Sequence, residues 1–182
     1  MAGIVRADTF RLNTIKSQDS DVTAMTIDAD GRISTPARPG FAAYLTASQS
    51  FTAAGDAQTL IFTATTHNEG NCYNTTTGAF TAPITGLYFF ALNPRFDGLS
   101  GSSYVRAMIT KVATTDTSPW NNYDDTLSAI IGNSHATNYQ TLSVSGCLYL
   151  NANDVVYARG GHVNDTAFSM HTESQFSGYF VG

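Results

Sequence analysis

Short apolar segments separated by turn residues run through most of this chain. The densest segment, Leu87–Leu92, carries apolar side chains at both sets of alternating positions. Leu87, Phe89 and Ala91 would point to one side of a strand, with Tyr88, Phe90 and Leu92 on the other. An antiparallel strand with one wet face normally alternates apolar with polar residues. We therefore expect both faces to be covered, one by the domain's own core and the other by a partner subunit.

Other segments predict further short strands between turn residues. They are Phe41–Leu45, Thr59–Thr63, Tyr104–Thr110, Leu127–Ile131, Gln140–Leu150, Val155–Ala158 and Phe176–Val181. In Tyr104–Thr110 the alternation places Arg106 and Thr110 on a half-exposed face. Asn71, Asn74 and Gly78 supply turn and left-handed positions between the first strands. The pattern indicates an all-β domain.

A fixed series of residues in the centre of the chain adds a family resemblance. The series is Asn68, Tyr73, Gly78, Phe80, Pro83, Gly86, Tyr88 and Phe90. It resembles the central signature of the complement C1q-like domain, and Phe176-Ser-Gly178-Tyr179 resembles that family's closing strand. Asn153-Asp154 stands where the family usually has Gly-Asp, a mild departure because Asn tolerates a left-handed backbone. The resemblance extends from about Phe41 to Gly182.

This resemblance implies a C1q/TNF-like jelly-roll sandwich that assembles as a homotrimer. The inner sheets of such a trimer would form the subunit interface. The residues that we expect there are Phe41, Tyr44, Tyr88, Phe90, Tyr149 and Tyr179.

The N-terminal segment differs from the rest of the chain. Residues 1–36 are polar and too poor in apolar residues to form a core alone, whereas 37–182 would be the jelly-roll domain. Met25–Ile33 predicts a short hairpin with its turn at Asp30-Gly31. Thr35–Phe41 predicts an extended linker, because its two prolines and one glycine exclude a helix. This arrangement resembles fibre and appendage proteins of tailed bacteriophages, which implies a neck or attachment segment; a loose leader is the alternative.

Composition and charge exclude several classes of function. Charged residues make up only 13% of the chain, and its net charge is −5 without a Lys/Arg cluster, so we expect no nucleic-acid partner. No run of about 18 apolar residues occurs, so we expect no membrane insertion. The N-terminus lacks the apolar core of a secretory signal. Without such a signal, Cys72 and Cys147 predict two partly buried thiols rather than a disulfide.

No catalytic constellation stands out, so the sequence predicts a protein that is not an enzyme. There is no G-x-S-x-G elbow, and the four histidines are not spaced to share a metal from one element. His171-Thr-Glu173 could place both side chains on one face of a strand, a pattern typical of exposed polar pairs. Some C1q-like trimers hold calcium near the threefold axis, and Asp124, Asp125 and Asp154 are the acidic candidates. Solvated loop carboxylates are the alternative, and we assign no cofactor and no metal site.

The irregular stretch Thr114–Asn138 is the candidate binding loop. It contains the only tryptophan, Trp120, together with Tyr123, Asp124 and Asp125. Polar loops that carry a few aromatic residues are frequent binding surfaces. The alternative is that Trp120 closes one end of the sandwich as a core residue.

Two functions remain. The first is a virion component of a bacteriophage, synthesised in the host cytoplasm: a short fibre, spike or capsid decoration. Residues 1–36 would contact other virion proteins, and the head would stabilise the particle or bind a host-surface glycan or protein. The second is a cellular C1q-like recognition or adhesion module.

Overall fold

The computed structural model describes residues 12–51, 55–99, 104–112, 126–132, 139–162 and 167–182. The chain divides into two compact units, Met1–Arg38 and Pro39–Gly182, which we call the N-terminal unit and the head. All regular elements in the described part are strands, and no helix there is long and apolar enough to cross a membrane.

The N-terminal unit is an antiparallel sheet of three short strands. They are β1 (Thr14–Lys16), β2 (Thr23–Ile27) and β3 (Ile33–Ser34), in that order. The predicted hairpin is confirmed, since β2 pairs with β3 and Gly31 has a φ of 80°. The Asp28 carboxylate accepts the backbone N–H groups of Asp30 and Arg32, each at 2.9 Å, which fixes the turn.

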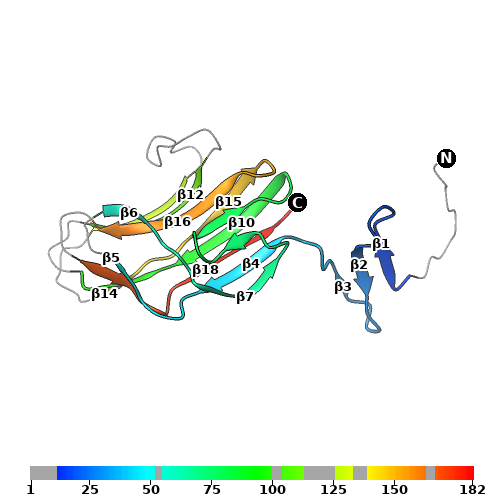
Figure 1. Ribbon diagram of the computed structural model, residues 1–182, viewed down its shortest axis with the longest axis horizontal. Helices are drawn as coiled ribbons and strands as arrows, with labels where there is room; N and C mark the ends of the chain where they lie inside the picture. The colour runs from blue at the N-terminus through cyan, green and yellow to red at the C-terminus, as the bar shows by residue number, and fades with distance from the viewer. Residues whose placement is uncertain (1–11, 52–54, 100–103, 113–125, 133–138, 163–166) are drawn as a thin grey trace. The chain divides into compact units, whose positions relative to one another are not determined.

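The first sheet of the head contains five antiparallel strands. In spatial order they are β15 (Val144–Leu150), β10 (Gly86–Asn93), β18 (Gln175–Phe180), β4 (Gly40–Tyr44) and β7 (Ala64–Glu69). In Figure 1, β10 in green, β18 in red and β4 in cyan run side by side. Beyond Pro94 the chain continues into a smaller sheet. Its order is β14 (Tyr139–Thr141), β11 (Arg95–Asp97), β17 (Phe168–Met170) and β5 (Gln49–Phe51).

The opposing sheet completes the sandwich. Its order is β13 (Thr126–Gly132), β12 (Tyr104–Val112), β16 (Val155–His162), β9 (Ala79–Thr81) and β8 (Tyr73–Asn74), with β6 (Gly55–Thr59) also paired to β16. This two-sheet all-β fold is the predicted jelly roll.

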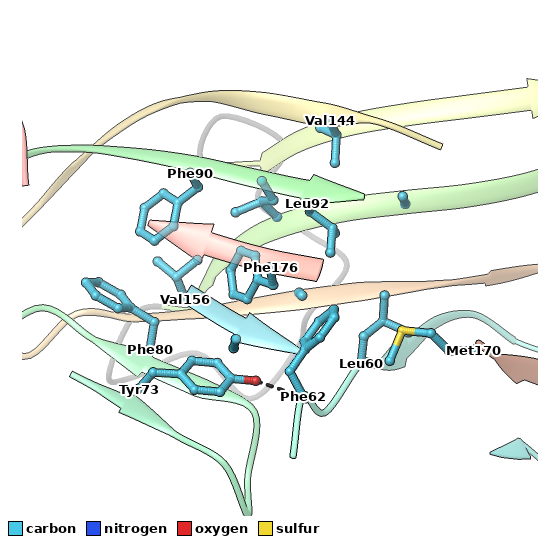
Figure 2. Close-up of a cluster of buried hydrophobic side chains, with 14 of the residues drawn as sticks. Leu60, Phe62, Tyr73, Phe80, Phe90, Leu92, Val144, Val156, Met170 and Phe176 are labelled. Atoms are coloured by element: carbon cyan, nitrogen blue, oxygen red, sulfur yellow. Dashed lines mark hydrogen bonds between the residues drawn. The ribbon is translucent and has the colours of Figure 1, made fainter. Parts of the chain in front are cut away.

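Aromatic rings fill the space between the two sheets (Figure 2). The Phe41 ring stacks on Tyr73 with centroids 4.7 Å apart and meets Phe176 edge-on at 5.0 Å. Phe80 contacts Phe90 in a T-shaped pair at 5.1 Å. Such pairs add about 0.5–1.5 kcal/mol each beyond area burial, so this cluster joins the sheets firmly.

The Tyr73 hydroxyl at the edge of this cluster has one partner. It accepts the backbone N–H of Phe62 at 3.1 Å, the dashed line in Figure 2. Burial raises the pKa of Tyr73 to about 12, because the phenolate would lose its hydration inside the core. The hydroxyl therefore stays protonated at neutral pH.

Three predictions about strands were wrong. Gln140–Leu150 does not form one strand, because it is divided between β14 in the smaller sheet and β15 in the five-stranded sheet. Thr59–Thr63 does not form one strand: β6 ends at Thr59, and Leu60 and Phe62, both 0% exposed, lie in the core outside any strand. Thr110 is buried rather than half-exposed. Its register partner on β16 is Tyr157, whose neighbour Arg159 lies over the Tyr157 ring at 5.2 Å, so long side chains flank the threonine.

Gly178 is required where β18 passes the aromatic cluster. A Cβ atom at this position would lie 2.5 Å from Cδ1 of Phe90 and 2.9 Å from Cε1 of Phe41. Contacts this short do not occur, so the rings pack directly on the backbone of β18.

We expect Gly178→Ala to lower the free energy of unfolding by about 1–3 kcal/mol, because the added methyl forces buried rings off their positions. Ser177→Ala, on the adjacent outward position, is the matched control and should change little. Denaturant unfolding followed by circular dichroism measures both. An unchanged midpoint for Gly178→Ala would show that the rings are not held against this backbone.

Candidate functional site

One face of the five-stranded sheet points away from the core, and its part over β15, β10 and β18 carries large apolar side chains. Outward positions of the three strands β15, β10 and β18 align across the sheet. Cys147 pairs with Phe89, which pairs in turn with Tyr179, and Tyr149 pairs with Leu87. We call these five residues the outward aromatic face.

Large apolar groups on this face are open to solvent in the single chain. Tyr149 is 62% exposed and Tyr179 is 55% exposed, while Phe89 is half-buried against the Tyr179 ring at 5.4 Å between centroids. The outward positions of β15, β10, β18 and β4 include no charged residue. A contiguous apolar patch of this kind marks an interaction surface.

Three of the six residues predicted at the trimer interface lie elsewhere. Phe41 is 3% exposed, and Tyr88 and Phe90 are 0% exposed, because they occupy the inward positions of β4 and β10. Their side chains belong to the core of the protomer, so this part of the prediction was wrong. Tyr44, Tyr149 and Tyr179 lie outward, and their role at an interface remains a prediction.

Sequence reasoning missed the other members of the face. Leu87, Phe89 and Cys147 were not named individually, although the segments that contain them were expected to be apolar on both faces and to contact a partner subunit. The two-residue period shows that β10 has two apolar rows, but both rows contain an aromatic residue. Only the pairing of Phe90 with Gly178 on β18 decides which row faces inward.

The predicted binding loop, Thr114–Asn138, lies outside the described residues except for 126–132, which form β13. Trp120, Tyr123, Asp124 and Asp125 all fall in 113–125, so their role stays a prediction.

Asp154 is the one calcium candidate among the described residues, and its carboxylate already has partners within a turn. The Asp154 carboxylate accepts the backbone N–H of Asn151 at 2.8 Å and lies 3.2 Å from the Lys111 ammonium. Asn153 next to it has a φ of 73°, the left-handed position expected from the sequence. Among the described residues, no three potential ligand side chains gather to hold a metal ion.

The His171 and Glu173 pair belongs to an ion-pair cluster. The Arg95 guanidinium donates to Glu173 at 2.7 Å and to Asp97 at 2.8 Å, and it lies 4.5 Å from the Tyr139 ring centroid. These two carboxylates raise the pKa of Arg95 above its usual value. His171 Nδ1 accepts the backbone N–H of Glu173 at 3.3 Å. The cluster therefore stabilises the turn between β17 and β18.

The two cysteines are free thiols in different surroundings. Cys72 is buried, and desolvation raises its pKa to about 11, which makes it unreactive at neutral pH. Cys147 is exposed on the outward aromatic face, although the sequence led us to expect a partly buried thiol. It is therefore a natural reporter of whether that face is covered.

Two antiparallel sheets with this strand order define a jelly-roll domain of the C1q and TNF type. Residues 40–181 match the C1q domain, so the chain belongs to the C1q domain family. Domains of this kind are generally non-enzymatic binding modules and typically form trimers.

Solved structures agree with this fold. The globular domain of zebrafish complement 1qA protein is similar, with a TM-score of 0.56 and 16% identity over 79% of this chain and 98% of that chain. Murine APRIL at pH 8.0 has a TM-score of 0.56 and 12% identity over 78% of this chain and 97% of that chain. At these identities the likeness concerns the fold alone. No curated protein matches the chain.

Proposed function

We propose that this chain is a non-enzymatic recognition component that works as a homotrimer, with three heads packed through the outward aromatic face. The observation that carries this proposal is the exposure of Tyr149 and Tyr179 on a sheet whose other face already forms the core. A solvated sheet face would carry polar residues at these positions. Tyrosine rings suit an interface, because they bury a large area with few rotatable bonds and keep a polar end.

We further propose that the head is displayed on a bacteriophage virion through residues 1–36. Support comes from the N-terminal sheet, which is amphipathic. Ile15, Met25, Ile27 and Ile33 share one face through their cross-strand pairs, whereas Thr14, Thr26 and Ser34 share the other. Ile33 is 64% exposed and Ile15 is 40% exposed, so a sheet this small cannot bury its own apolar face.

A partner protein in the particle would cover that apolar face. The head would then be free to stabilise the particle or to contact a host surface. A cellular recognition module would share the head and its trimer, but its N-terminal segment would have no particle to bind.

The first test uses Cys147 as a reporter of the trimer. In the native protein we expect both thiols to react slowly with a thiol reagent, because Cys147 lies under neighbouring subunits and Cys72 in the core. Tyr179→Glu places three carboxylates on the interface and should weaken it by about 2 kcal/mol or more per subunit. In that variant Cys147 should react near the rate of an unstructured cysteine.

The added carboxylate lies two strands from Cys147 and would disfavour its thiolate, so faster reaction cannot arise from electrostatics. Cys147→Ser in the same background is the control and should remove the fast phase. A folded native protein whose Cys147 reacts freely would contradict the proposed interface.

The second test concerns attachment to the particle. Deleting residues 1–35 should leave a folded, trimeric head that no longer appears on purified virions in an immunoblot. As a matched pair within the full chain, Ile33→Asp should reduce incorporation, whereas Ser34→Asp on the opposite face should not. Normal incorporation of the truncated chain would show that this segment is not the anchor.

A further inference from the structure

The sheet that contains β12 and β16 carries an arginine on its outward side, away from the core. Ala158 and Gly160 on β16 are buried, so the side chain of Arg159 between them points outward. In the register of the sheet, Arg159 lies between Met108 on β12 and Thr59 on β6. The two sheets of a sandwich turn their outward sides in opposite directions. A trimer packed through the outward aromatic face therefore leaves Arg159 uncovered.

The Arg159 guanidinium has no ion pair and no hydrogen bond within the described part of the chain. Its Nε is buried without a partner, and its Cζ lies 5.2 Å from the centroid of the Tyr157 ring. The hydroxyl of Thr110, which faces Tyr157 in the register, is likewise buried without a partner. The two Nη groups are not closed off from solvent as Nε is, because Arg159 remains partly exposed. The forked end of the side chain is thus open to a ligand.

This arrangement is unfavourable for the protein alone. Burial lowers the pKa of Arg159 below its usual value, because the charged form loses hydration. Arg95 and Lys111 differ, since Arg95 donates to Asp97 and Glu173 and Lys111 lies 3.2 Å from a carboxylate oxygen of Asp154. The chain has a net charge of −5, yet no described carboxylate pairs with Arg159. A partly buried charge without a partner is typical of a binding site.

The guanidinium selects the charged group of the ligand. Its two Nη groups lie in one plane and can donate parallel hydrogen bonds to both oxygens of a carboxylate. One positive charge balances one carboxylate, whereas a phosphate dianion would add excess negative charge to a chain that is already negative. Arg106, which lies on the same side of β12, already has an interaction of its own. The site therefore fits a monovalent carboxylate.

The surroundings of Arg159 favour a small polar ligand over a protein. Among the described side chains, none of the exposed large apolar ones lies on β12 or β16. A protein partner would find no exposed anchor there of the kind that dominates protein interfaces. Thr59 places a hydroxyl on the strand next to the guanidinium. A carboxylate together with hydroxyls is the chemistry of a uronic acid.

We propose that Arg159 binds the carboxylate of a uronic acid residue in a glycan. This assignment rests on the proposed recognition role, since it names the class of ligand that the head recognises. The stem of Arg159 lies between two neighbouring strands, and its guanidinium lies over the Tyr157 ring. The forked end is positioned before the ligand arrives, which lowers the entropy cost of binding.

The test is a titration of the full chain with single sugars, followed by saturation-transfer NMR and calorimetry. Glucuronic and galacturonic acids are the ligands, and glucose and galactose are their neutral counterparts with an alcohol in place of the carboxylate. Acetate and inorganic phosphate report on charge alone. A sugar held by one charged contact on an open surface should bind with a Kd on the order of 1 mM.

We expect at least one uronic acid to bind about tenfold more tightly than its neutral counterpart, because only the acid accepts charge-assisted hydrogen bonds. It should also bind more tightly than acetate or phosphate. Equal binding of the neutral sugar would show that the carboxylate is not recognised. Equal binding of acetate or phosphate would show that charge alone is recognised. Either result, or no uronic acid bound at about tenfold above 1 mM, overturns the proposal.

Three variants assign the binding to Arg159. Arg159→Met keeps an apolar stem but removes the charge, and should weaken binding of the uronic acid by about tenfold or more. Arg159→Lys keeps the charge without the fork, and should weaken it by about threefold to tenfold. Arg32→Met removes the same charge from the N-terminal unit and should bind like the native chain. Unchanged binding in Arg159→Met rejects the site.

The stability of Arg159→Met separates a binding role from a structural one. Without ligand, this variant should unfold at the same denaturant concentration as the native chain or at a higher one, because it removes a partly buried charge that lacks a partner. If a carboxylate of the chain itself pairs with Arg159, the midpoint falls sharply and no added uronic acid binds, which overturns the proposal. If Arg159→Met does not fold, Arg159→Lys decides, and native-like binding by that variant rejects the forked contact.

The oligomeric mass of each sample separates this proposal from the trimer. A trimer that binds no uronic acid leaves the interface intact and rejects the sugar site. A monomer that binds a uronic acid through Arg159 does the reverse. If only a dissociated Tyr179→Glu sample binds the uronic acid, Arg159 is covered in the trimer, and the proposal is overturned.

Discussion

The structure depends on a single constraint in β10: large apolar side chains on both of its faces. The inner row is fixed, because Phe90 and Phe41 pack directly on the backbone at Gly178 and tie β10, β18 and β4 to the opposing sheet. Shifting the register by one residue would turn every side chain of the strand over and bring Phe89 inward in place of Phe90. The outer row is then left on the surface as a consequence of how the core is packed.

The distribution of charge follows from the same arrangement. The ion pairs described in the head lie at turns and strand ends, where Arg95 joins Asp97 and Glu173, and Lys111 joins Asp154. The centre of the outward face is left without charge. An interface there would bury tyrosine rings without desolvating an ion, which is the arrangement that favours association.

Much of the fold could be predicted from the sequence because its signals are local. The two-residue period located β4, β13 and β18, and Asn153 and Gly78 marked backbone positions with positive φ that the structure contains. The pairing of strands that lie far apart in the sequence was harder to predict. Leu60 and Phe62 resembled part of a strand because they are apolar, but they are buried in the core outside any strand.

The candidate sites show the same limit. Which row of β10 faces outward depends on the close approach of its partner strand at Gly178, so Tyr88 and Phe90 could not be separated from Phe89 by pattern alone. Tyr149 and Tyr179 could be predicted as outward residues from the sequence, because they lie in segments that are apolar on both faces.

Burial of the outward aromatic face between subunits is the central claim, and the native mass of the purified full-length chain tests it most directly. Light scattering at micromolar concentration should give three times the 19.4 kDa mass of one chain. A folded chain that remains at 19.4 kDa under these conditions would contradict the claim.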